Sequence, residues 1–265
     1  MTDKKQDMTF LEHLEELRWH LIRAFISIVL FATLAFVYKD IIFDKIILAP
    51  KNSNFITYHW FCNLSNWLNV PALCLNIEPL QIINIKLTGQ FTSHINISIV
   101  AGLILAFPYV FWEIWRFIKP AFYENEMKHA RGAVLVSSLL FLTGTLFGYF
   151  IIVPLSVQFL GSYNISDQVL NQINLNSYIG TLTSIVMASA ITFELPVVIF
   201  FLSKAGLVSS SFLKRYRKHA IVLILIVAAI ITPPDVFSQI LVSLPLYALY
   251  EVGIIISKKI EKSAR

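Results

Sequence analysis

One carboxylate in this sequence stands where a charge is costly. Glu194 lies inside an apolar run, residues 178–202, that is long enough to cross a bilayer, and no cationic residue lies within a turn or two of it. An acidic group in the middle of a membrane costs about 2.5 to 3.5 kcal/mol, so such groups usually face a bundle interior, a hydrated cavity or a partner chain. Glu194 is therefore a candidate for polar chemistry inside the membrane.

The backbone beside Glu194 is expected to open. Pro196 follows two residues later and removes the donor that would have bonded to the carbonyl of Thr192. Hydroxyl side chains make this segment polar on more than one side, which suits a partly hydrated face. The alternative is a protonated Glu194 that is hydrogen-bonded to a neighbouring helix.

Two further groups of acids lie outside the apolar runs. Glu12, Glu15 and Glu16 precede the first run, in a segment that Thr9 and Glu12 open as a capping box of an amphipathic helix. Glu124 and Glu126 lie in the loop after the second run, among basic residues. The plainest interpretation of the first group is a solvated acidic face, with Glu15 paired to Arg18 three residues later.

Motifs of enzyme or metal chemistry are absent from the sequence. It has no Walker A motif, HExxH motif or nucleophile elbow, and its six histidines share no ligand spacing. We therefore expect no enzymatic activity, no cofactor and no metal site. The two cysteines, Cys62 and Cys74, both fall in the longest loop, where a disulfide and two free thiols remain open alternatives.

The elements that must position these residues are membrane helices. Hydrophobic residues make up 57% of the chain and charged residues only 14%, which indicates an integral membrane protein. The apolar runs predict six spans in a single domain, residues 1–265: 20–38, 95–118, 133–153, 178–202, 220–231 and 236–256. The fold class expected is an all-α, polytopic, concave bundle with short fifth and sixth spans.

The basic residues predict the orientation of this bundle. With the amino terminus in the cytoplasm, all Lys and Arg except Lys39, Lys45, Lys51 and Lys86 fall on the cytoplasmic side. Both termini are therefore expected inside. No cleavable signal peptide is expected, since acids precede the first run and no small-residue cleavage pattern follows it. The net charge of +5 follows from this sorting and is weak evidence for nucleic-acid binding.

Two connections are expected to have roles of their own. The outer loop, residues 39–94, is too long for a simple connector, and we expect a cap over the outer mouth of the bundle, with interface-anchoring aromatic residues as the alternative. Between the last two runs, Pro233 and Asp235 predict a tight turn, with Asp235 capping the last helix and Gln239 in its first turns.

Four stretches together resemble the TatC family, the receptor subunit of the twin-arginine protein translocase. They are HLEELR at residues 13–18, FIKPAFY at 117–123 leading to Glu126, FELP at 193–196 and TPPDVFSQ at 232–239. The resemblance covers nearly the whole chain in order. The part of the outer loop at residues 51–76 departs from it, being longer than we expect for the family.

The resemblance implies a function and a set of sites. Folded preproteins with a paired-arginine signal peptide would dock on the cytoplasmic face of the bacterial inner membrane and cross it by using the proton-motive force. Single-span TatA/TatB-type subunits would be partners, with self-association and contact with membrane lipid. The implied signal-peptide site comprises Glu16, Glu126, Glu124, Arg18 and Phe117. The implied intramembrane polar or partner contacts are Glu194, Gln239 and Asp235. The prolines implied to have a structural role are Pro50, Pro108, Pro196 and Pro233.

Within this implied site, Glu16 and Glu126 would receive the arginine pair, because a guanidinium binds a carboxylate through two hydrogen bonds and lysine cannot. Arg18 is expected to order the amino-terminal segment instead. The competing hypothesis is a proton-coupled secondary transporter of a small solute, with Glu194 as its proton relay. An internal repeat would favour the transporter, and the sequence shows none.

Overall fold

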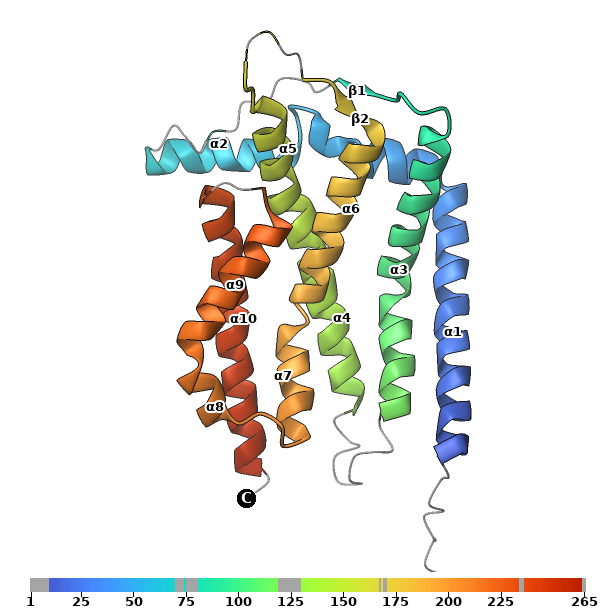
Figure 1. Ribbon diagram of the computed structural model, residues 1–265, viewed down its shortest axis with the longest axis vertical. Coiled ribbons are helices and arrows are strands. Elements are labelled where there is room, and N and C mark those ends of the chain that lie inside the picture. Colours follow the sequence, from blue (N-terminus) through green and yellow to red (C-terminus); the bar gives the residue numbers. More distant parts are fainter. Residues whose placement is uncertain are drawn as a thin grey trace, which may run out of the picture. The chain divides into compact units, whose positions relative to one another are not determined.

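The computed structural model describes residues 10–69, 74, 81–118, 130–166, 168, 171–233 and 236–263, and almost all of them are helical (Figure 1). The elements are α1 (Phe10–Val37), η1 (Asp40–Ile47), η2 (Ala49–Lys51), α2 (Ile56–Leu68), β1 (Ile82–Ile83), α3 (Gly89–Ile118), α4 (Ala130–Phe147), η6 (Gly148–Ile152), α5 (Val153–Ser162), β2 (Ile173–Asn174), α6 (Leu175–Thr192), α7 (Leu195–Lys204), α8 (Ser210–Arg215), α9 (Arg217–Ile231) and α10 (Val236–Ser263). The parallel pair β1–β2 is a small exception to the all-α prediction.

Five helical segments of the described chain are long and apolar enough to cross a membrane: His13–Val37, Gly89–Ile118, Gly132–Ser162, Leu175–Lys204 and Ser238–Lys262. They overlap with five of the six predicted spans. The remaining one corresponds to α9, whose 15 residues extend about 22 Å, against a hydrocarbon core of about 30 Å. The predicted fifth span thus corresponds to a short helix, and its crossing of the membrane stays a prediction.

The prediction of a short last span is wrong. α10 continues for 28 residues, because its helix does not end with the apolar run but carries on through the basic residues Lys258, Lys259 and Lys262. Hydropathy marks where apolar side chains stop, whereas the backbone remains helical wherever hydrogen bonding and packing allow it. The same reasoning explains why α3 begins before its predicted span.

The chain divides into two compact units, Met1–Val37 with Ser98–Leu139, and Tyr38–Ile97 with Leu140–Arg265. In the first unit α1 and the latter part of α3 run antiparallel, since His20 contacts Glu113 and Ala32 lies against Gly102. A Cβ atom at Gly102 would lie 2.5 Å from the backbone nitrogen of Ala32. Only glycine permits this approach of the two backbones.

In the second unit, the end of α4 and η6 pack closely against α6. A Cβ atom at Gly144 would lie 2.9 Å from the Cα atom of Ala190, and one at Gly148 would lie 3.1 Å from the Cα atom of Val186. The hydroxyl of Ser189 donates a hydrogen bond of 2.9 Å to the carbonyl of Gly144. The two glycines, four residues apart, thus let the backbones of α4–η6 and α6 approach closely.

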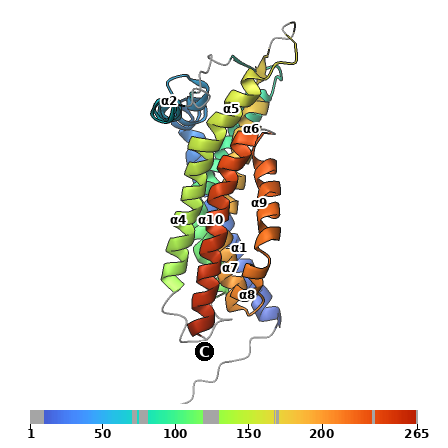
Figure 2. The same cartoon turned by 90° about the vertical axis from the view of Figure 1, so that its left-hand side faces the viewer.

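The carboxyl-terminal helices of this unit form a second packed group, in which α10 contacts α7, α8 and α9 (Figure 2). The side-chain amide of Gln239 on α10 donates to the carbonyl of Leu225 on α9, at 3.1 Å. Near the other end of α10, the Glu261 carboxylate accepts hydrogen bonds from the amide and the hydroxyl of Ser210, at 2.6 and 2.5 Å. These bonds fix both ends of α10 to the preceding helices.

The segment that precedes α3 is fastened to the same unit by tyrosine hydroxyls. Tyr178 and Tyr149 donate to the carbonyls of Ile47 and Ile46 in η1, at 2.8 and 2.7 Å. Tyr58 donates to the carbonyl of the buried Pro50, at 2.5 Å. A disulfide joins Cys62 of α2 to Cys74, so the structure takes one of the two alternatives that the sequence leaves open.

Candidate functional site

The first unit contains a buried charge cluster between α1 and α3. Glu113, only 1% exposed, hydrogen-bonds to Nδ1 of the buried His20. The Nε atom of Arg23 lies 3.4 Å from Oε2 of Glu113, and the Nη1 atom of Arg116 lies 3.7 Å from Oε1. We call His20, Arg23, Glu113 and Arg116 the α1–α3 cluster.

Helical spacing explains how the sequence assembles this cluster. His20 and Arg23 are three residues apart on α1, and Glu113 and Arg116 are three apart on α3, so each pair lies on one helix face. A buried carboxylate is tolerable only where cations and hydrogen bonds compensate its lost hydration. The two half-exposed guanidinium groups and the imidazole supply that compensation.

Glu16 lies one turn before the cluster and differs from Glu113 in its surroundings. Its side chain is 36% exposed, and the Nε2 atom of His20 lies 4.0 Å from its Oε1 atom. Imidazole can donate from both nitrogens when it is protonated, so His20 can bridge Glu113 and Glu16. Glu113 is thus already neutralised by its neighbours, whereas Glu16 keeps carboxylate oxygen available for an external cation.

Two other predicted site residues lie close to Glu16. The Phe117 ring stacks on the imidazole of His13, with ring centroids 4.6 Å apart, and meets His20 edge-on. Arg18 pairs with Glu15 at 3.7 Å, and both side chains are well exposed, as the solvated-face interpretation predicts. The structure therefore brings Glu16 and Phe117 together around His20 and directs Arg18 elsewhere.

Several predicted residues fall outside the described part of the chain. They are Glu124 and Glu126 of the signal-peptide site, Asp235 of the last turn, and Thr9 of the capping box. Among the predicted signal-peptide residues, the structure therefore describes Glu16, Arg18 and Phe117.

Glu194 lies at a break between two helices of the second unit. α6 ends at Thr192, α7 begins at Leu195, and the buried Pro196 stands in the first turn of α7. The amide of Glu194 bonds to the carbonyl of Ile191, three residues back, and its own carbonyl accepts from Val197 and Val198. The predicted opening beside the acid is confirmed.

The side chain of Glu194 is half-buried, and its Oε1 atom is shielded from solvent. Phe193, directly before it, packs against Gly144 and lies 5.3 Å from the ring of Phe147. The position of Glu194 is thus held by the packing of α4 on α6. A helix break in a membrane span frees backbone groups and so provides a polar position in an apolar element.

The remaining predicted residues have structural surroundings. Gln239 is bonded to α9, as described above. Pro108 lies inside α3, where it removes one backbone donor, and Pro233 is buried next to the end of α9. Among the described residues no group of three His, Cys, Asp or Glu side chains could hold a metal ion.

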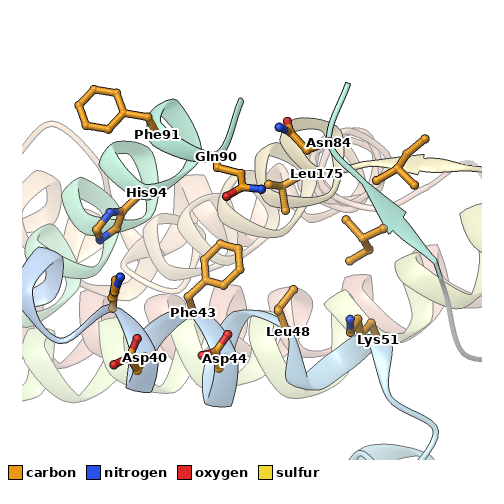
Figure 3. Close-up of a pocket in the computed structure, with 13 residues that line it drawn as sticks. Asp40, Phe43, Asp44, Leu48, Lys51, Asn84, Gln90, Phe91, His94 and Leu175 are labelled. Atoms are coloured by element: carbon orange, nitrogen blue, oxygen red, sulfur yellow. The ribbon is translucent and has the colours of Figure 1, made fainter. Parts of the chain in front are cut away.

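A pocket of about 580 Å³ lies in the second unit where η1 and η2 face β1 and the starts of α3 and α6 (Figure 3). Phe43 projects from η1 toward Gln90 and Leu175, and His94 projects from α3 toward η1. The lining combines both signs of charge, with Lys39, Asp40, Asp44 and Lys51 at its edge.

The sequence analysis missed the α1–α3 cluster, although a signal for it exists. Glu113 lies inside the predicted span 95–118, and His20 and Arg23 lie inside the predicted span 20–38. The cost argument used for Glu194 applies to these charges as well. Opposite charges in two predicted spans indicate that the spans are neighbours.

Comparison with known proteins identifies the family of this chain. The family model of TatC, the Sec-independent protein translocase protein, matches residues 12–245. The chain belongs to the TatC family. The TatC protein of Blattabacterium sp. subsp. Periplaneta americana is 39% identical over 264 residues, which cover 99% of either chain. The TatC protein of Aquifex aeolicus is 34% identical over 253 residues, which cover 95% of either chain.

A solved structure agrees with this assignment. The crystal structure of the twin arginine translocase receptor TatC in DDM matches with a TM-score of 0.71 and 32% identity, covering 93% of this chain and 99% of that one. As a TatC family member, the chain is a component of a Sec-independent protein translocase, a transport protein with apolar membrane helices.

Proposed function

We propose that this TatC protein is the receptor subunit that binds paired-arginine signal peptides of folded preproteins and nucleates the translocation complex driven by the proton-motive force. It would lie in the bacterial inner membrane with six crossings, α9 being the fifth, and with both termini and the signal-peptide site in the cytoplasm. The distribution of basic residues supports this orientation.

The environment of Glu16 is the observation that carries the proposal. Its carboxylate is half-exposed beside a rigid cluster whose own acid, Glu113, is buried and compensated. A guanidinium group from a signal peptide can therefore bind Glu16 without displacing an existing short ion pair. Glu126, with Glu124 as an auxiliary, would supply the second carboxylate.

Arginine is preferred at such a site because its planar donors match a carboxylate with two parallel hydrogen bonds. Lysine offers a single compact charge at the same place. A hydrogen bond to a charged group contributes about 1.5 to 3 kcal/mol, so loss of one such bond reduces binding about tenfold or more. We expect a preference of at least this size for a paired-arginine peptide over its paired-lysine variant.

The experiment is a binding titration of labelled signal peptide against the purified full-length protein in detergent. Glu16→Gln with Glu126→Gln should abolish the preference for arginine. Glu15→Gln is the matched control, because Glu15 is the adjacent acid on α1 and is paired with Arg18. An unchanged preference in the double variant, or an equal loss in the control, would refute the assignment of the site.

We further propose that Glu194 contacts a polar side chain of a single-span TatA/TatB-type partner or the inserted signal hairpin. Its position at the break between α6 and α7 supports this, since the packing of Phe193 on Gly144 fixes the acid in place. Glu194→Ala should reduce crosslinking to the partner, and Glu194→Gln should reduce it less, because glutamine keeps the hydrogen-bonding groups. If both variants crosslink and transport as the wild type does, Glu194 has only a structural role.

A further inference from the structure

The helix α2 presents three distinct faces. Thr57, Tyr58 and Ser65 are buried against the second unit, and Phe61 is partly buried beside them. Ile56, Trp60, Leu64 and Trp67 form an exposed apolar stripe on another side; at 3.6 residues per turn they fall within about 80° of one another. We call these four residues the α2 stripe.

A polar strip completes the circumference of the helix. His59, Asn63 and Asn66 are exposed and lie within about 60° of one another, between the α2 stripe and the buried face. A helix that is merely attached to a protein needs one apolar face and one solvated face. The second apolar face of α2, with Trp60 and Trp67 at 67% and 78% exposed, requires a further apolar partner.

The contacts of α2 show at which height along the neighbouring membrane helices it lies. Phe55 and Tyr58 form a core cluster with Leu155 of α5, and residues of η6 and Leu241 of α10 pack against this cluster. From Leu241, α10 extends about 24 Å to Ser257, the end of its apolar run, and about 32 Å to Lys262. These lengths bracket the hydrocarbon thickness of about 30 Å, so α2 lies at one boundary of the hydrocarbon layer.

The direction of α2 agrees with this level. Figures 1 and 2 show α2 lying across the direction of α10, at the end where α10 begins. Hydrogen bonds hold it in that direction: the hydroxyl of Thr57 donates to the carbonyl of Phe150 at 2.6 Å, and Tyr58 donates to that of Pro50. A helix that crosses the spans at their ends runs parallel to the membrane surface.

The composition of α2 selects lipid as the partner of the stripe. The helix contains no Asp, Glu, Lys or Arg, and tryptophan is enriched where the hydrocarbon layer meets the headgroups. An amphipathic helix in this plane buries its apolar face at the boundary between headgroups and acyl chains. Near its start, α10 also has exposed apolar side chains, Ile240 and Leu244.

We propose that the α2 stripe inserts into the membrane interface at the end of the spans where α10 begins, and that α2 is an interfacial anchor of the longer loop of this chain. The polar strip faces water, the buried face holds the second unit, and the stripe faces lipid. Insertion stabilises the position of the start of α10, because Leu241 packs against the core cluster that includes Tyr58 of α2.

Tryptophan fluorescence tests the proposal on the full-length protein. Trp19, Trp112 and Trp115 are replaced by Phe, and the protein is reconstituted into vesicles of phosphatidylethanolamine and phosphatidylglycerol. Single-reporter forms retain Trp60 or Trp67. The matched control carries Trp60→Phe, Trp67→Phe and Asn63→Trp, which places the only reporter on the polar strip of the same helix.

Quenching by lipids brominated near the glycerol end of the acyl chains is compared with quenching by acrylamide in water. We expect Trp60 and Trp67 to lose most of their emission to the brominated lipids and little to acrylamide, and the Asn63→Trp reporter to show the reverse. The proposal is overturned if acrylamide quenches Trp60 and Trp67 as strongly as it quenches the Asn63→Trp reporter. Protection from both quenchers would also overturn it, because a protein partner or a second copy would then cover the stripe.

Discussion

Replacement of Glu113 by glutamine isolates the electrostatic role of the α1–α3 cluster. Glutamine keeps the shape of the side chain and one hydrogen-bond acceptor for His20, but it removes the negative charge that faces Arg23 and Arg116. The carboxylate is 1% exposed, whereas the two arginines are about half-exposed and can recover part of their hydration. The perturbation therefore acts on one buried charge.

The magnitude follows from these exposures. Removing one partner of a fully buried ion pair costs about 3 to 5 kcal/mol, and an exposed pair contributes about 0 to 1 kcal/mol. A cluster with a buried acid and half-exposed bases lies between these limits, so we expect a loss of about 2 kcal/mol in the free energy of unfolding. For a chain of this size that loss lowers the melting temperature by about 4 to 8 °C.

The assay is thermal unfolding in detergent, followed by far-UV circular dichroism. Glu15→Gln is the control, since it removes an acid of α1, the helix that packs against α3, and the ion pair of Glu15 with Arg18 is exposed on both sides. A double-mutant cycle with His20→Gln separates the His20–Glu113 coupling from the effects of each residue alone. If Glu113→Gln melts within about 1 °C of Glu15→Gln, the cluster does not stabilise the protein and the reasoning fails.

Three more predictions concern the second unit. Gly144→Leu should lower the melting temperature strongly, because its Cβ atom would lie 2.9 Å from a backbone atom of α6, whereas Gly180→Ala, with no atom within 4 Å, should be tolerated; equal effects would contradict the packing argument. Joint replacement of Cys62 and Cys74 by serine should reduce stability by up to about 3 kcal/mol through loop closure, measured as a shift in the unfolding midpoint, and treatment of the wild type with reductant should give the same shift. Burial raises the pKa of the Tyr58 hydroxyl. The stability that this protonated hydroxyl contributes is therefore complete below about pH 10 and is lost as the pH rises toward the raised pKa. The melting temperature of Tyr58→Phe should fall less at alkaline pH than that of the wild type, and parallel profiles would refute this.

Glu194 and Glu113 differ in how easily the sequence indicates them. Glu194 has no cation nearby along the chain and a proline two residues later, so its cost and the local helix break are both evident from composition and spacing. Glu113 has an arginine three residues later and aromatic neighbours, which suggest an ordinary membrane interface. Only the pairing of α3 with α1 shows that its carboxylate is buried on His20 and Arg23.

For the outer loop, too, the sequence alone leaves the role of its side chains undecided. Its aromatic residues predict either a cap or an interfacial anchor, because both need apolar surface and tolerate asparagine and serine. The distinction between the buried face of α2 and its exposed stripe depends on what packs against Tyr58 and Phe61, and those contacts come from η6 and α10, far away in the sequence. The disulfide between Cys62 and Cys74 likewise requires a distance that the sequence does not contain.

The sequence by itself determined that this is a helical membrane protein of the TatC type, which helices are apolar enough to span, and that α9 is short. These properties depend on local composition and on motifs, which the chain carries in every conformation. The tertiary structure decided which charges are compensated and which remain available, as for Glu113 and Glu16, and which apolar faces are covered, as in α2. Burial and ion pairing are relations between distant segments, so their energies exist only once the helices have packed.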